Sequence, residues 1–264
     1  MSKNSNCLNC NAKLYDKFCS KCGQKSDTHR ITLKHFLFHD ILHGVWHVDK
    51  GILFTVKEAI TRPGQAALDY ISGKRIKYYN VFYLILILIG LNLFLSNHYD
   101  QMAHTYFGTV LEPTTNAKGK AIDDFIHNNS KLIIFSFVPL FAINSFILFG
   151  RKKLNFSEHF IIAGMVYLGV LLFTTTIEIL AFLEFIKYIN VITDYINLIL
   201  VTGMVIYVIY SYYNAFKLEY SKISYTLRMT LFVSFLLLEI LFLVILLLGF
   251  ITKWKGGNIE LVHQ

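Results

Sequence analysis

Long apolar stretches alternate with shorter polar connections from about residue 79 to the C-terminal tail. A helix needs about 20 residues to cross a hydrocarbon core roughly 30 Å thick, and five stretches approach or exceed that length. They predict five membrane-spanning helices. The predicted spans are Tyr79–Ser96, Leu132–Phe149, Phe160–Phe185, Tyr195–Tyr213 and Leu227–Ile251.

The segment from Ile31 to Gly73 has a different pattern, because its apolar residues recur at helical spacing and Pro63 and Gly64 interrupt them. It predicts two or three short amphipathic helices in the plane of the membrane interface. The expected fold is an all-α membrane protein, a helical transmembrane bundle of about five spans with interfacial helices before it. The expected divisions are 1–28, a small N-terminal module, 29–78, the juxtamembrane helices, 79–252, the bundle, and 253–264, a C-terminal tail.

Lys and Arg gather on alternate connections between the predicted spans, and cytoplasmic connections are the ones enriched in these residues. The basic residues are Lys74, Arg75 and Lys77 before the first span, Arg151, Lys152 and Lys153 after the second, and Lys217, Lys222 and Arg228 after the fourth. This alternation predicts a cytoplasmic N-terminus and an external C-terminus. Lys253 and Lys255 in the tail depart from it.

The composition excludes an ordinary soluble protein, since 55% of the 264 residues are hydrophobic and only 16% are charged. The formal net charge is +8, and most of the excess precedes residue 80, beside the first span. Anionic lipid head groups attract such a segment, so membrane lipids are the expected partners and no nucleic acid is expected.

The N-terminal module holds all the cysteines of the chain in two CxxC pairs. Residues 1–30 contain no apolar core of a secretory signal, so we expect this arm to stay in the cytoplasm, where thiols remain reduced. Paired thiolates at this spacing predict a four-sulfur zinc ribbon. The expected ligands are Cys7, Cys10, Cys19 and Cys22. A dithiol redox pair or a chance cluster is the alternative; a closed zinc site would fold the arm and not catalyse.

A row of histidines follows the ribbon at every fourth position, which places its members on one helical face. They are His35, His39, His43 and His47. Neighbouring members are a candidate second metal site or a pH-sensitive surface. The alternative is that they occupy the polar side of an interfacial helix, which Gly44 interrupts.

The segment before the first span combines basic and aromatic residues. Arg62, Lys74 and Arg75 are candidates for contact with a lipid head group or another anion. Anchoring of the helix ends at the head-group level is the alternative, because Tyr and basic residues do this in membrane proteins generally.

Two carboxylates lie inside predicted spans, where a charge is costly and therefore calls for a partner or a proton. Glu178 and Glu239, with Asn144, form the candidate intramembrane polar site. The alternative is that they only join helices through hydrogen bonds. The sequence has no catalytic residue pattern such as HExxH, a phosphate loop or a Ser-His-Asp order, so we expect a non-enzymatic protein.

Several short motifs resemble those of a bacterial family of unknown function, DUF3667. The matching stretches are the two CxxC pairs, Asp49 to Thr55, Arg62-Pro63-Gly64, Tyr70-x-x-Gly73-Lys74-Arg75 and Tyr78-Tyr79-Asn80. Val81 stands where the family pattern suggests proline. The resemblance implies the architecture and a bacterial inner membrane, and it brings no reaction.

Our leading hypothesis is a scaffold whose zinc ribbon and interfacial helices dock a cytoplasmic protein. The competing hypothesis is a transporter or channel component in which Glu178 and Glu239 line a polar path. The third is a membrane-embedded enzyme acting on lipid, using the histidine row with Arg62, Lys74 and Arg75.

Overall fold

The computed structural model describes residues 5–26, 28, 31, 51–107, 117–186 and 190–252. This part is helical apart from the N-terminal module, and it contains no β-strand, only isolated bridges. The α-helices are α2 (Gly51–Thr61), α3 (Pro63–Ile71), α4 (Val81–Phe107), α5 (Ala117–Leu148), α6 (Phe156–Ala181), α7 (Asn190–Phe216) and α8 (Lys222–Thr252), with short 3-10 helices η2 (Gly150–Lys152) and η3 (Phe182–Phe185). The predicted fold class is confirmed.

Among the described residues, five helices are long and apolar enough to cross a membrane, as the hydropathy pattern predicts. Their candidate spans are Val81–Tyr106, Asn128–Leu148, Phe156–Phe185, Tyr195–Phe216 and Lys222–Gly249. The first helix continues about ten residues beyond the predicted end at Ser96. The apolar run stops at Ser96, which is why the predicted span ends there. The helix continues because no Gly or Pro lies between Ser96 and Gly108.

Helix α6 is the centre of the bundle and packs against α3, α4, α5 and α7. Within its apolar window 61% of the residues are buried, against 6% for α8, which packs mainly on α5. A Cβ at Gly169 of α6 would overlap the ring of Tyr207, so glycine here lets α7 approach closely.

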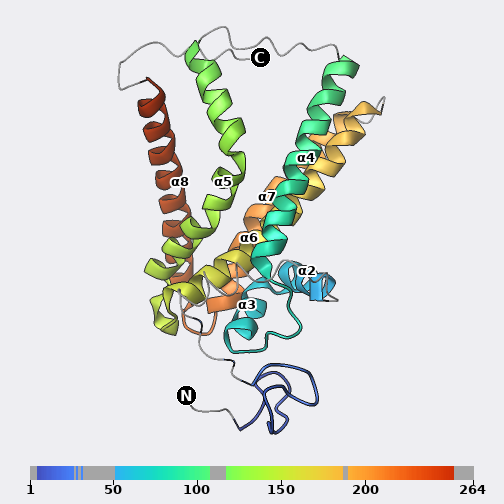
Figure 1. The fold of residues 1–264 in the computed structure, drawn as a ribbon. Coiled ribbons are helices and arrows are strands. Elements are labelled where there is room, and N and C mark those ends of the chain that lie inside the picture. Colours follow the sequence, from blue (N-terminus) through green and yellow to red (C-terminus); the bar gives the residue numbers. More distant parts are fainter. Residues whose placement is uncertain are drawn as a thin grey trace.

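Figure 1 shows two groups of helices that meet near the N-terminal module and diverge toward the far end. One group is α5 with α8, and the other is α4, α6 and α7. α5 bends part-way along its length and contains Pro139, which removes a helical hydrogen bond.

Aromatic side chains fill the end where the two groups meet. The rings of Phe149 and Phe216 stack with centroids 4.7 Å apart, and Tyr212 lies 4.7 Å from Phe232. These contacts join α7 to α8 and to the residue that follows α5. At the same end Asn155 caps α6, and its side chain donates to the carbonyl oxygen of Ile31 at 3.0 Å.

Candidate metal centre

Two tight turns of the same shape carry the four cysteines. In each, the residue after the CxxC pair donates its backbone N–H to the first cysteine's carbonyl oxygen at 2.8 Å: Asn11 to Cys7, and Gly23 to Cys19. These two residues have positive φ angles, 57° for Asn11 and 77° for Gly23. Glycine and asparagine tolerate this conformation best, and it turns the chain back past the thiols.

The second turn repeats the first at an offset of 12 residues. The antiparallel bridge of Asn6 with Lys13 recurs as Phe18 with Lys25. The flanking backbone bonds recur as well: Cys7 and Leu14 donate to Ala12 and Ser5, and Cys19 and Ser26 donate to Gln24 and Lys17. Cysteine spacing alone did not predict this repeat, although a lysine follows each pair at the same distance.

The four sulfur atoms lie within 4.8 Å of one another. The distance between the Sγ atoms is 3.6 Å for Cys7 and Cys22 and 3.5 Å for Cys10 and Cys19, so each close pair joins the two turns. A tetrahedral site with metal–sulfur bonds of about 2.3 Å requires sulfur atoms about 3.8 Å apart. The arrangement fits, and the four thiols can hold one metal ion.

The protonation of the cluster also suits a cation. The Ala12 backbone lowers the pKa of Cys10, but burial and the neighbouring thiols outweigh this and raise it to about 11. Burial acts to raise the pKa of Cys22, yet hydrogen bonding to the Gln24 backbone helps to lower it to about 6. Neighbouring thiols therefore resist ionising together, because thiolates repel one another. A bound cation offsets this repulsion.

The ribbon is attached to the loop after α3 through the side chain of Gln24. Its Nε2 donates to the carbonyl oxygen of Gly73 at 2.7 Å, and its Oε1 accepts the N–H groups of Arg75 and Ile76 at 3.2 and 3.4 Å. The side chain is buried. Because it follows the last cysteine by two residues, it couples the metal site to this loop directly.

Gly73 ends α3 and also accommodates the ribbon. Its φ is +103°, and it forms a Schellman motif in which Gly73 and Lys74 donate to the carbonyl oxygens of Tyr70 and Asp69 at 3.1 and 3.0 Å. A Cβ here would lie 2.5 Å from Cδ1 of Leu8 on the first turn. Glycine is therefore required twice, once by the backbone and once by the contact.

The start of α2 packs on the chain that leads into α4. Thr55 accepts the backbone N–H of Tyr79 through Oγ1 at 2.8 Å and donates to the carbonyl oxygen of Gly51 at the same distance. A Cβ at Gly51 would lie 3.1 Å from the Lys77 carbonyl oxygen. Burial, with help from nearby Glu58, raises the pKa of Tyr78 and keeps this phenol protonated.

Residues 49–91, which contain these contacts, match the family model DUF3667, described as a protein of unknown function. This segment of the chain is similar to the DUF3667 family. The resemblance seen in the sequence is confirmed for these residues, and the match covers α2, α3, the loop after them and the first part of α4. No curated protein and no solved structure matches the chain.

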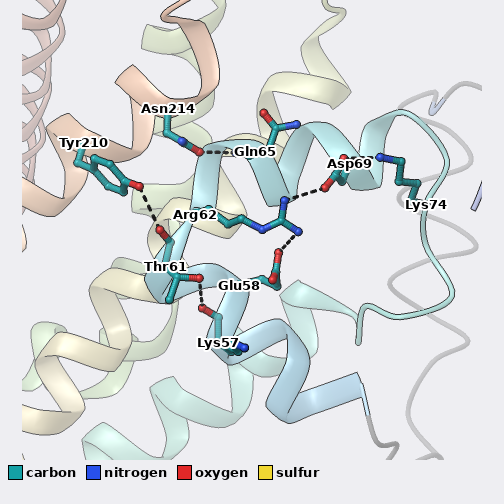
Figure 2. Close-up of polar contacts among 9 residues, drawn as sticks. All are labelled: Lys57, Glu58, Thr61, Arg62, Gln65, Asp69, Lys74, Tyr210 and Asn214. Atoms are coloured by element: carbon teal, nitrogen blue, oxygen red, sulfur yellow. Dashed lines mark hydrogen bonds and ion pairs between the residues drawn. The ribbon is translucent and has the colours of Figure 1, made fainter.

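The predicted anion-binding cations of the DUF3667 segment lie beside carboxylates. Figure 2 shows Arg62 between Glu58 and Asp69, with ion pairs to both, the second at 3.2 Å. Lys74 pairs with the other oxygen of Asp69 at 2.8 Å. The Arg75 guanidinium lies 5.5 Å from the centre of the Tyr70 ring, and its Nε donates to the Tyr70 carbonyl oxygen at 3.3 Å. Two of the three cations therefore hold α2, α3 and the following loop together.

α7 provides the surface on which the DUF3667 segment rests. Tyr207 and Tyr210 donate to the carbonyl oxygens of Ala59 and Thr61 at 2.6 and 3.1 Å. Asn214 accepts the N–H of Gln65 near the start of α3 at 2.7 Å (Figure 2). The DUF3667 segment therefore contacts both the helical bundle and the ribbon.

The predicted second site lies outside the described residues, since His35, His39, His43 and His47 all fall in 32–50. The structure therefore neither supports nor opposes it.

Of the predicted intramembrane residues, the structure brings two together. Asn144 on α5 donates to Oε2 of Glu239 on α8 at 2.9 Å. Glu178 lies on α6, and among the described residues no hydrogen bond or ion pair joins it to Glu239. A polar pair that sequence reasoning missed lies one residue away, where Ser145 and the buried His159 contact each other at 2.7 Å. These contacts link α5 to α8 and to α6.

Proposed function

We propose that this chain is a docking protein of the bacterial inner membrane, in which a zinc-loaded ribbon presents a protein-binding surface on the cytoplasmic side. The observation that supports this proposal is that the Gln24 side chain binds the ribbon to the loop after α3, while the large aromatic side chains of the ribbon stay exposed. Tyr15 is 83% exposed and Phe18 is 59% exposed. Exposed aromatic side chains on a small rigid module are typical anchors of a protein interface.

The charge around these aromatics favours an acidic partner. Within residues 5–26 the ribbon carries four lysines, Lys13, Lys17, Lys21 and Lys25, and a single acid, Asp16. The Lys13 ammonium lies 5.7 Å from the centre of the Tyr15 ring, so charge and apolar surface occupy one place. A protein segment with acidic side chains around an apolar pocket has the complementary chemistry.

Zinc is the proposed metal because four thiolates select a soft or borderline cation in tetrahedral geometry. With four protein ligands no coordination position stays open, so the metal serves the fold of the ribbon. The cytoplasmic orientation rests on the basic residues beside the ribbon and on alternate connections.

Photo-crosslinking in membranes of the producing cell tests the proposal on the full-length chain. A photoreactive amino acid replaces Phe18, and the matched control carries it at Tyr195, which is 66% exposed and lies near the start of α7, at the opposite end of that helix from Phe216. We expect a discrete protein adduct from position 18 that disappears when Cys22→Ser removes a metal ligand. Adducts with lipid only, or the same protein adduct from position 195, would contradict the docking function.

A transport role is the second candidate, and the Asn144–Glu239 contact is the observation that favours it. A partly exposed carboxylate on an otherwise apolar span is costly unless it has a use or a partner. Flux measurements on the Glu239→Gln variant, described below, separate this candidate from simple helix association.

A further inference from the structure

The connection between α5 and α6, the connection between α7 and α8, and the start of α8 bring basic residues around Tyr220. The guanidinium carbon of Arg151, next to α5, lies 5.0 Å from the centre of the Tyr220 ring, and that of Arg228 on α8 lies 4.7 Å from it. The backbone N–H of Arg151 also donates to the Tyr220 hydroxyl at 3.0 Å. We call Arg151, Tyr220 and Arg228, with their two connections, the Tyr220 cluster.

The Tyr220 cluster has a large positive excess. Residues 150–153 and 217–228 contain six cations, Arg151, Lys152, Lys153, Lys217, Lys222 and Arg228, and one acid, Glu219, which leaves a formal charge of +5. Glu219 is already paired with Lys152 at 2.5 Å. Each guanidinium donates a hydrogen bond to a neutral carbonyl oxygen, Arg151 to Glu219 and Arg228 to Leu148, and such bonds do not neutralise its charge.

The position of the cluster matches the depth of lipid phosphates. The candidate spans on either side end at Leu148 and Phe216 and begin again at Phe156 and Lys222. Five of the cations lie between these ends or at one of them, and Arg228 lies in the second turn of the last span. Basic residues and tyrosine at that depth meet head groups. The cluster is therefore placed where a membrane supplies anions at high local concentration.

Exposed apolar side chains beside the cations distinguish a lipid from a soluble anion. Leu218 is 87% exposed and Ile223 is 77% exposed, and both belong to the same connection as Lys217 and Lys222. Such residues beside charged ones suit a ligand that has an anionic head and an apolar tail. A free phosphate would use only the cations.

From these observations we infer that the Tyr220 cluster binds the phosphate group of an anionic phospholipid. Arg151 and Arg228 are the proposed head-group ligands, and Leu218 and Ile223 contact the acyl chains. The proposed lipid contact thus lies in the bundle, at residues other than Arg62 and Lys74, whose charges are matched by Glu58 and Asp69. The site requires neither the metal nor a docking partner.

Native mass spectrometry of the full-length protein tests this inference. The protein is released from nanodiscs that contain equal amounts of phosphatidylglycerol and phosphatidylcholine, and the bound lipids are counted. We expect the wild type to retain phosphatidylglycerol preferentially. Arg151→Gln and Arg228→Gln should each reduce that preference roughly fivefold, the factor given by about 1 kcal/mol per basic residue.

Control variants and a competition experiment with inorganic phosphate test whether the lipid preference depends on the Tyr220 cluster and on a phospholipid. Lys57→Gln removes an exposed positive charge from α2, outside the cluster, and should leave the preference unchanged. Arg151→Lys should restore part of it, and an unaltered unfolding midpoint in neutral lipid shows that Arg151→Gln folds. Equal losses in Lys57→Gln and Arg151→Gln would overturn the site, as would absence of any preference in the wild type. Displacement of the lipid by millimolar inorganic phosphate would overturn the assignment to a phospholipid.

Discussion

The buried side chain of Gln24 donates a hydrogen bond to the carbonyl oxygen of Gly73 at 2.7 Å. One partner follows the last metal ligand by two residues, and the other ends the helix at the centre of the DUF3667 segment. The four-thiol ribbon and the DUF3667 segment are therefore joined by this contact, and a change in one of them should affect the stability of the other.

Gln24→Ala should loosen the ribbon without removing its metal. The change removes the three hydrogen bonds of the Gln24 side chain, and a typical hydrogen bond contributes about 0.5–1.5 kcal/mol net. Hydrogen exchange of the full-length protein should show faster exchange in residues 5–26, with unchanged metal content. Gln65→Ala is the control, because the Gln65 side chain is exposed and only its backbone is bound. Equal exchange in both variants would contradict the coupling.

Gly73→Ala should destabilise the same junction from the other side. An alanine at φ +103° is strained, and its Cβ would meet Leu8, so we expect a loss of about 1–3 kcal/mol in the free energy of unfolding. Adding Leu8→Ala should recover the part due to the contact and leave the part due to the backbone. A thermal unfolding series of the single and double variants measures both, and a double variant no better than Gly73→Ala would assign the whole loss to the backbone.

Metal analysis should find one zinc per chain, and its affinity should rise with pH. With its pKa raised to about 11, the Cys10 thiol is protonated at neutral pH until a metal displaces the proton. Binding therefore releases protons, and a lower proton concentration favours it. Competition with a chelator at several pH values measures the trend. A second stoichiometric metal would instead support the histidine row, and Cys19→Ser should abolish only the ribbon metal.

Asp69→Asn should weaken the contact among α2, α3 and the following loop. It removes a carboxylate that pairs with Arg62 and Lys74, and partly exposed pairs contribute about 0–1 kcal/mol each. The loss should shrink at high salt, because the screening length falls to about 3 Å at 1 M. Unfolding midpoints at low and high salt check this, and Lys57→Gln again provides the control. A loss independent of salt would point to packing and not to charge.

Glu239→Gln separates transport from helix association. An amide keeps a hydrogen bond to Asn144 and removes the cost of a carboxylate within an apolar span, so the stability of the bundle should be unchanged or higher. If the transport candidate is correct, proton or solute flux in reconstituted vesicles is lost in this variant. Wild-type flux indistinguishable from that of empty vesicles would remove the candidate.

Local sequence patterns were enough to predict the five candidate spans, the four-thiol cluster and the DUF3667 match of residues 49–91. Each depends on a local pattern: runs of apolar residues, cysteines two apart, and short motifs before the first span. Hydropathy placed the start of the first span within two residues, at Tyr79 against Val81. It misplaced the end, because a helix continues past its apolar part until its backbone is interrupted.

Which of the candidate residues contact one another depends on the three-dimensional packing of the helices and loops. Gln24 and Gly73 are 49 residues apart, Asn144 and Glu239 are 95 apart, and Arg151 and Tyr220 are 69 apart. The residue types were visible in the sequence, but their partners depend on how helices cross and where loops end. For that reason the sequence could not show that Glu58 and Asp69 lie beside Arg62 and Lys74.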